Sequence, residues 1–249
     1  MSKKVLIIDI GNTATEFAVF NGKNLQDFLG FFKLPDEIEK AKIALKSFKN
    51  QGYSIDDAMI FSVVPKIEDF VKKIVEDVFE KRPDVFDWKR YELDNKSKKI
   101  KEAIGADLLA DIIAARNEKN FPSLIVDFGT ITKLLYLDEN GSFEGLSMIP
   151  GLEASLKTFS MKTALLPDLE ELKSLSSLGT DTVSSMYHGV YYSTLYYVNG
   201  VLNSLDNDKI KLIITGGNLR FIKDEFKDAI IDPELTLKGM NILYQEIRK

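Results

Sequence analysis

Two short segments with the same pattern lie almost half a chain length apart and constrain the fold more than any other feature. One is KVLIIDIGNT, from Lys4 to Thr13, and the other is SLIVDFGT, from Ser123 to Thr130. In each, a run of aliphatic residues predicts a strand buried on both faces, an aspartate ends the strand, and a glycine turn follows. Such a repeat predicts an internal duplication with two α/β domains, residues 1–117 and 118–249.

The residues at the end of the first strand suit a metal-bound phosphate. Asp9 can bind Mg²⁺ through its water shell, the amides of Gly11, Asn12 and Thr13 can face phosphate oxygens, and the Thr13 hydroxyl adds a donor. Taken alone, this turn is equally consistent with a β-hairpin in which the aspartate and asparagine only form the turn. The repeat of the pattern favours phosphate binding, and therefore phosphoryl transfer or nucleotide hydrolysis over a non-catalytic α/β protein.

Duplicated domains of this kind are ribonuclease-H-like and occur in sugar kinases, actin and the Hsp70 ATPase domain. In those proteins the ATP phosphates are held between the two turns. We therefore expect an actin-like ATPase fold, with two such domains around a central nucleotide cleft.

The composition excludes several classes of protein. The chain has no cysteine, which rules out disulfides, thiolate metal sites and a cysteine nucleophile. A net charge of −5 argues against a nucleic-acid partner. The N-terminus lacks the features of a signal peptide, and no run approaches the about 18 apolar residues of a membrane span. We expect a cytoplasmic protein without a membrane partner.

Two features of the second half bear on ligands and assembly. The predicted strand Lys211–Thr215 is followed by Gly216 and Gly217, which allow a planar group such as adenine or ribose to approach the backbone, although glycines after strands also form simple turns. A predicted helix from Thr182 to Ser204 carries a stripe of tyrosines. Such a stripe is typical of a core or a subunit interface rather than of base stacking.

Several motifs along the chain occur in a fixed order. They are Asp9–Thr13, Ser62–Pro65, Gly105–Asp107, Asp127–Thr130, Ile149–Leu152, Thr163–Pro167, Gly179 with Thr182, Thr215–Gly217 and Asp232–Gly239. In this ordered set, which covers nearly the whole length, the chain resembles the type III pantothenate kinases of the actin-like ATPase superfamily.

The resemblance implies an activity, its cofactors and an assembly. The activity is ATP-dependent phosphorylation of the primary hydroxyl of pantothenate, the first step towards coenzyme A. The cofactors are ATP with Mg²⁺ and a monovalent cation, K⁺ or NH₄⁺. The assembly is a homodimer through the helix Thr182–Ser204.

The resemblance also implies site residues. Asp107 would be the base that takes the proton of the attacking hydroxyl, Asp9 would serve the divalent metal, and Asp127 the monovalent cation. Phosphate and nucleotide would contact Gly11, Asn12, Thr13, Gly129, Thr130, Gly216 and Gly217, and the acceptor would contact Gly105, Ala106 and Thr182. The residues alone favour a helix cap for Asp107; the Gly-Ala pair before it, which matches the family motif, favours the base.

The chain also departs from the family pattern. Leu108 stands where the family has an arginine that binds the anionic acceptor, and the second phosphate loop reads GTITKLL from Gly129, where the family has GTATTFD. Three interpretations follow. The chain is a pantothenate kinase in which lysines of residues 96–101 replace the arginine, a kinase for another small acceptor, or a non-enzymatic regulatory or binding member.

Overall fold

The computed structural model describes residues 3–88, 91, 104–163, 165–169, 178–205 and 207–248. The chain forms two compact units, one of Met1–Asn117 with Leu235–Lys249 and the other of Glu118–Glu234. The sequence placed residues 235–249 in the second domain, whereas the structure packs this segment in the first unit. No helix in the described part of the chain is both long and apolar enough to traverse a bilayer.

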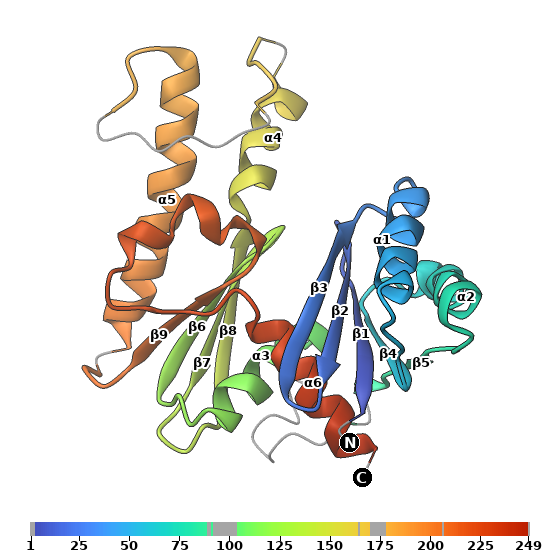
Figure 1. Ribbon diagram of the computed structural model, residues 1–249. Coiled ribbons are helices and arrows are strands. Elements are labelled where there is room, and N and C mark those ends of the chain that lie inside the picture. Colours follow the sequence, from blue (N-terminus) through green and yellow to red (C-terminus); the bar gives the residue numbers. More distant parts are fainter. Residues whose placement is uncertain are drawn as a thin grey trace. The chain divides into compact units, whose positions relative to one another are not determined.

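The first unit is built on a five-stranded mixed sheet of order β3-β2-β1-β4-β5 (Figure 1). Its strands are β1 (Lys4–Ile10), β2 (Thr15–Asn21), β3 (Asn24–Phe32), β4 (Asp57–Ser62) and β5 (Asp84–Val85). Its helices are α1 (Ile38–Asn50), the 3₁₀ turn η1 (Pro65–Ile67), α2 (Glu68–Phe79), α3 (Ala106–Asn117) and α6 (Leu235–Ile247).

The central strand β1 is buried on both faces, as its aliphatic run predicts. Leu6, Ile8 and Ile10 pack into one core cluster with buried residues of α1 and α2. The other face of the sheet carries α3 and α6, which contact β4 and β1 respectively. Because helices cover both faces, the strand ends are the parts of this sheet left open to a ligand.

The last helix belongs to the first unit because it packs closely on α3. A Cβ on Gly239 would collide with the main chain of Ala110, so only glycine permits this approach. Thr236 Oγ1 donates a hydrogen bond to the buried Asp111 at 2.7 Å, and Asn241 Nδ2 donates to the Gly22 carbonyl at 2.9 Å.

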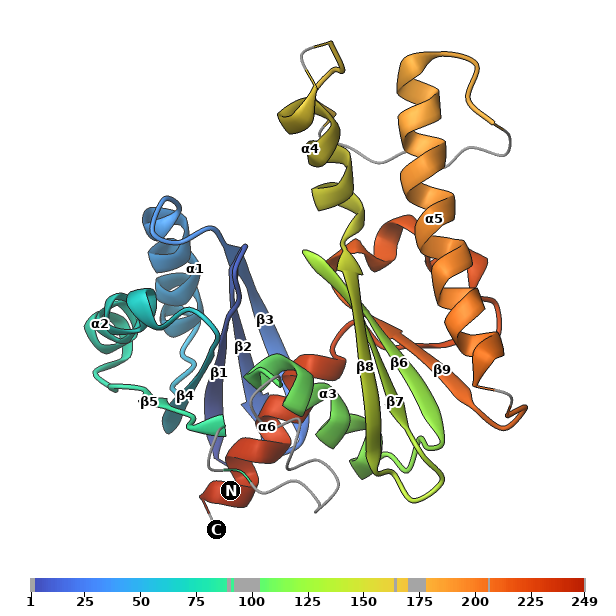
Figure 2. The same cartoon turned by 180° about the vertical axis from the view of Figure 1, so that it is seen from behind.

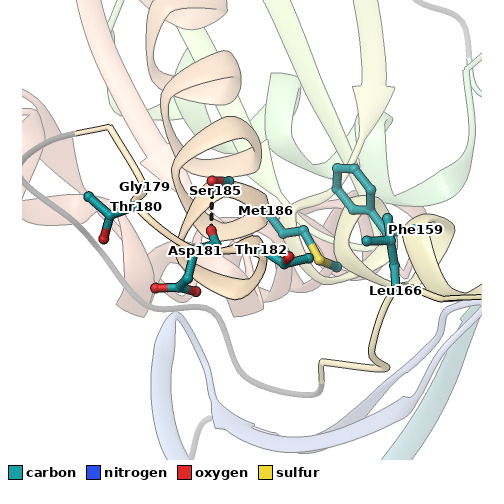
Figure 3. Close-up of a pocket in the computed structure, with 8 residues that line it drawn as sticks. All are labelled: Phe159, Leu166, Gly179, Thr180, Asp181, Thr182, Ser185 and Met186. Carbon is teal, nitrogen blue, oxygen red and sulfur yellow. Dashed lines mark hydrogen bonds between the residues drawn. The ribbon is translucent and has the colours of Figure 1, made fainter.

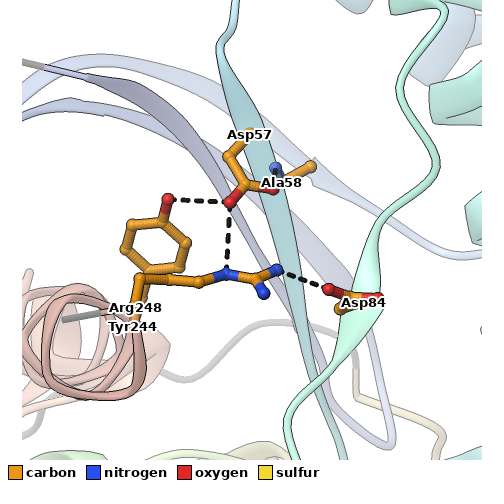
Figure 4. A network of polar contacts seen from close by, with 5 residues as sticks. All are labelled: Asp57, Ala58, Asp84, Tyr244 and Arg248. Atoms are coloured by element: carbon orange, nitrogen blue, oxygen red, sulfur yellow. Dashed lines mark hydrogen bonds and ion pairs between the residues drawn. The ribbon is translucent and has the colours of Figure 1, made fainter.

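The end of α6 is attached to the sheet by a polar network (Figure 4). The Tyr244 hydroxyl donates to Asp57 Oδ2 at 2.9 Å, and Arg248 Nε lies 3.2 Å from the same oxygen. Arg248 also pairs with Asp84. Burial, together with the hydrogen bond to Asp57, raises the pKa of Tyr244 to about 12.

The second unit repeats this plan with a sheet of order β10-β9-β6-β7-β8. Its strands are β6 (Ser123–Phe128), β7 (Ile131–Leu137), β8 (Phe143–Pro150), β9 (Lys211–Thr215) and β10 (Ile230–Ile231). Its helices are α4 (Leu152–Lys162), α5 (Thr182–Ser204) and the 3₁₀ segments η4 (Gly217–Phe221) and η5 (Lys223–Glu225). Helices α4 and α5 contact each other and share a core cluster with β6 (Figure 2).

The two sheets have the same connectivity. β1 and β6 each pair antiparallel with the following strand and parallel with a later one, β4 or β9. Asp9 and Asp127 therefore occupy corresponding positions, each near the carboxyl end of a central strand. The sequence repeat is thus a structural repeat, as predicted.

Candidate active site

The first predicted phosphate turn follows β1 in the first unit. Asp9 is half-buried and lies between Glu16 of β2 and Phe61 of β4. The Gly11 amide donates to the Ala14 carbonyl at 3.0 Å, and the two residues between them, Asn12 and Thr13, are exposed. The turn is therefore fixed at its base and exposed at its tip, as a ligand-binding turn must be.

Asp107 lies at the second position of α3, with the residue before the helix packed against its carboxylate. A Cβ on Gly105 would lie 2.5 Å from Asp107 Oδ1 and 3.2 Å from Val63 Cγ1. Val63 directly follows β4, and its amide donates to the Ile10 carbonyl at the end of β1 at 3.0 Å. This chain of contacts brings the start of α3 to the carboxyl ends of two parallel strands, the edge where ligands bind in open α/β sheets.

The second predicted phosphate turn, Gly129–Thr130, is held in place by two other segments of the second unit. The Asn218 side-chain amide donates to the Gly129 carbonyl at 3.0 Å, and the Gly151 amide donates to the Thr130 carbonyl at 2.9 Å. A Cβ on Gly151 would collide with both carbonyl groups, so glycine is required there. The main chain of this turn is therefore positioned before any ligand binds.

The paired glycines after β9 have different surroundings. Gly216 has a φ of 97°, and a Cβ there would collide with the Asp127 carboxylate and lie 2.7 Å from the Phe128 main chain. Gly217, the first residue of η4, has nothing within 4 Å of its Cβ position. One glycine is needed for packing, and the other leaves space where a planar ligand could approach.

The Asp127 carboxylate is paired with a lysine of this chain. Lys133 Nζ lies 2.8 Å from Asp127 Oδ2, and the two side chains are only 16% and 12% exposed. The residues stand directly opposite each other on the antiparallel strands β6 and β7, so their side chains share one face of the sheet. Where the sequence predicts a monovalent cation, the structure thus places an ammonium group.

Thr182 lies in a different part of the second unit. It is the first residue of α5, next to Asp181, whose carboxylate accepts a hydrogen bond from the Ser184 amide at 2.9 Å and caps the helix. It lines an open pocket of about 580 Å³ (Figure 3), together with Phe159, Leu166, Gly179, Thr180, Asp181, Ser185 and Met186. The predicted acceptor residue is therefore accessible to a small molecule.

Comparison with known proteins decides the family. A family profile described as type III pantothenate kinase matches residues 5–204. The chain belongs to the type III pantothenate kinase family. A type III pantothenate kinase of Agathobacter rectalis is 32% identical over 97% of both chains, and one of Listeria welshimeri is 30% identical over 97% of this chain and 96% of its own.

Solved structures show the same fold at low sequence identity. A Baf family transcriptional activator from Campylobacter jejuni superimposes with a TM-score of 0.61 at 19% identity, over 98% of each chain. Component A of (R)-2-hydroxyglutaryl-CoA dehydratase from Acidaminococcus fermentans gives 0.56 at 14% identity, over the full length of both. Together with the duplicated sheets, these likenesses give the chain the actin-like ATPase fold.

Leu108, which stands where the family has an arginine, is buried in the structure. Its side chain is 4% exposed, whereas the neighbouring Asp107 is half-buried. A residue so placed contributes to packing rather than to binding a carboxylate. The lysine segment of residues 96–101, which the sequence offers as a replacement for the family arginine, lies outside the described residues.

The side chains at the two predicted ion positions fit Mg²⁺ but not the monovalent cation. Mg²⁺ in kinases is commonly bound by one or two carboxylates plus the substrate phosphates, and the half-buried Asp9 at a strand end can supply one. The described residues contain no group of three or more histidine or acidic side chains around a common point. A monovalent cation does not fit beside Asp127 in the same way, because Lys133 already supplies a positive charge there.

Three residues of the second unit were not predicted as site residues from the sequence. They are Asn218 and Gly151, which hold the predicted phosphate turn, and Lys133, which pairs with Asp127. For Lys133 a signal existed, because the hairpin through Gly129 and Thr130 places it opposite the aspartate. For Asn218 the sequence carries no such pattern.

Proposed function

We propose that this chain transfers the γ-phosphoryl group of ATP to the primary hydroxyl of pantothenate, giving 4′-phosphopantothenate and ADP, the first step of coenzyme A biosynthesis. Family membership over most of the chain carries this proposal. The position of Asp107 supports it, because a helix-start carboxylate beside the ends of β1 and β4 is where an acceptor hydroxyl would need a base.

The step assigned to Asp107 is proton removal. The hydroxyl oxygen attacks the γ-phosphorus, its proton passes to the Asp107 carboxylate, and the bond between the γ-phosphorus and the bridging oxygen breaks to release ADP. Phosphoryl transfer depends mainly on positioning and charge neutralisation, so a carboxylate that orients the hydroxyl is sufficient. The positive end of the α3 dipole favours the charged form of this group.

The remaining predicted residues divide into nucleotide and acceptor contacts. Gly11, Asn12, Thr13, Gly129 and Thr130 would bind phosphate oxygens, and Gly216–Gly217 would border the adenosine. Asp9 would hold Mg²⁺, which neutralises charge on the phosphates when bound. Acceptor contacts would come from Gly105, Ala106 and Thr182.

Two further parts of the proposal concern the protein in the cell. We assign it to the cytoplasm, where a kinase has access to ATP. We also assign it a homodimeric state through α5, whose Tyr196 is 66% exposed on a helix that packs Tyr187, Tyr191 and other residues into the core of its unit. A large exposed aromatic side chain is typical of an interface.

A second candidate is phosphorylation of a different small acceptor by the same residues. The observation that favours it is the burial of Leu108 at the position where the family has an arginine. An aliphatic side chain cannot form the paired hydrogen bonds that an arginine makes with a carboxylate. An acceptor without a carboxylate would need no such partner.

Single-turnover phosphorylation with Asp107→Asn tests the proposed base. We expect loss of pantothenate phosphorylation by about 100-fold or more, with binding of a fluorescent ATP analogue unchanged. Asp77→Asn, an exposed carboxylate on α2 of the same unit, is the matched control and should behave as wild type. An unchanged rate in Asp107→Asn would remove this residue from the mechanism.

A further inference from the structure

The Asp127–Lys133 ion pair lies beside the main-chain groups assigned to the nucleotide. The carboxylate has neighbours on several sides. Oδ2 is 2.8 Å from Lys133 Nζ, and Oδ1 is the oxygen next to the Cβ position of Gly216. The Cβ position of Gly129 is 3.4 Å from Oδ1 and 3.6 Å from Oδ2, so the carboxylate adjoins the lysine, the predicted phosphate turn and the glycine pair.

Burial makes the pairing energetically important. Both side chains are less than one-fifth exposed. Removing one partner of a buried ion pair leaves an uncompensated charge, which is strongly destabilising, so the Asp127 carboxylate requires a positive charge next to it. A lysine ammonium and an ammonium or potassium ion carry the same single charge, and each can contact carboxylate oxygens.

We infer that the Lys133 ammonium is the resident monovalent cation of the second phosphate turn, so that nucleotide binding by this chain does not require K⁺ or NH₄⁺. Lys133 is a positioning residue in this account. It neutralises Asp127 and keeps that carboxylate from repelling the phosphates bound by Gly129 and Thr130. The inference rests on the proposed function, because it requires that the turn Gly129–Thr130 binds ATP.

Nucleotide affinity in different salts tests the inference on the unmodified protein. A fluorescent ATP analogue is titrated with Mg²⁺ present, in choline, sodium, potassium or ammonium chloride at equal ionic strength. For wild type, the Kd should vary by less than about twofold among the four salts. A Kd at least about tenfold lower in potassium or ammonium than in choline would overturn the inference.

Lys133→Thr introduces the residue that the family has at this position. In this variant, nucleotide binding should depend on an external K⁺ or NH₄⁺ ion. Its affinity should fall by about tenfold or more in choline and recover in potassium or ammonium, because an external ion then balances Asp127. Lys133→Arg should remain independent of the salt. Lys157→Thr, an exposed lysine on α4, is the matched control and should resemble wild type. Weak binding by Lys133→Thr in every salt, from a folded protein, would contradict the account.

Thallium provides a measurement that needs neither nucleotide nor acceptor. It therefore tests the inference even if the protein shows no kinase activity. Crystals soaked in thallium(I), which replaces potassium in protein sites, should show an anomalous peak beside Asp127 in Lys133→Thr and none there in wild type. A peak at Asp127 in wild type would show that the lysine does not occupy the cation position.

Discussion

Substitution of Gly151 by alanine tests whether the turn before α4 positions the second phosphate turn. A Cβ on Gly151 would lie 2.7 Å from the Thr130 carbonyl oxygen, where ordinary contacts begin at 3.4 Å. It would lie closer still to the Gly129 carbonyl oxygen. Because both partners are main-chain atoms, no side chain can rotate away. The closer contact decides the displacement, and the two segments must separate by about 1 Å or more.

Two magnitudes follow from this displacement. Overpacking of this kind costs about 1–3 kcal/mol of folding free energy, which for a chain of this size lowers the Tm by several degrees. A shift approaching 1 Å in groups that position a reacting phosphate can cost about 100-fold in rate. The amide of residue 151, which donates to the Thr130 carbonyl at 2.9 Å, would move as well.

Thermal unfolding measures the loss of stability, and single-turnover phosphorylation measures the loss of rate. Titration with a fluorescent ATP analogue shows whether nucleotide binding is lost as well. Gly145→Ala, in β8 of the same unit, makes the same chemical change where nothing lies within 4 Å of the Cβ position, and should leave both properties near wild type. If Gly151→Ala bound nucleotide and unfolded like wild type, the turn would not be held as described.

Three other substitutions, the first with a control variant, extend the test. Leu108→Arg should lose more than about 3 kcal/mol in urea denaturation, because it removes a side chain that is 4% exposed and buries a charge. Leu178→Arg is the control, because this position is 77% exposed, and it should lose almost no stability. A stable Leu108→Arg protein with raised pantothenate phosphorylation would contradict the structural role given to Leu108. The raised pKa of Tyr244 means that its contribution to stability is present below about pH 10 and lost as the pH rises to about 12. Tyr244→Phe should therefore lose less unfolding free energy than wild type between these pH values. Equal slopes of unfolding free energy against pH in the two proteins would refute this. Asn218→Asp places a carboxylate oxygen where an amide donates to the Gly129 carbonyl at 3.0 Å, so nucleotide affinity should fall by about tenfold, and an unchanged Kd would exclude this contact as a support for the turn.

The strands that carry the site could be predicted from the sequence because their burial leaves a simple pattern. Runs of aliphatic residues before Asp9 and Asp127 place both carboxylates near the carboxyl ends of strands, where the structure has them. The predicted helix Thr182–Ser204 has the same bounds in the structure. These features depend on local periodicity, which one sequence records well.

The remaining features depend on contacts between distant residues. The sequence of α6 does not show that Gly239 meets Ala110 in the first unit. Likewise, the sequence shows that Leu108 stands where the family has an arginine, but not that its side chain is buried. Such contacts are set by tertiary packing, which local patterns do not encode.

Mass spectrometry of the reaction products tests the central claim most directly. Wild-type protein is incubated with ATP, Mg²⁺ and pantothenate, with a panel of uncharged primary alcohols in parallel, and each acceptor is examined for the addition of one phosphate. The account predicts phosphopantothenate and ADP in equal amounts. The absence of phosphopantothenate from a protein that still binds ATP would contradict it.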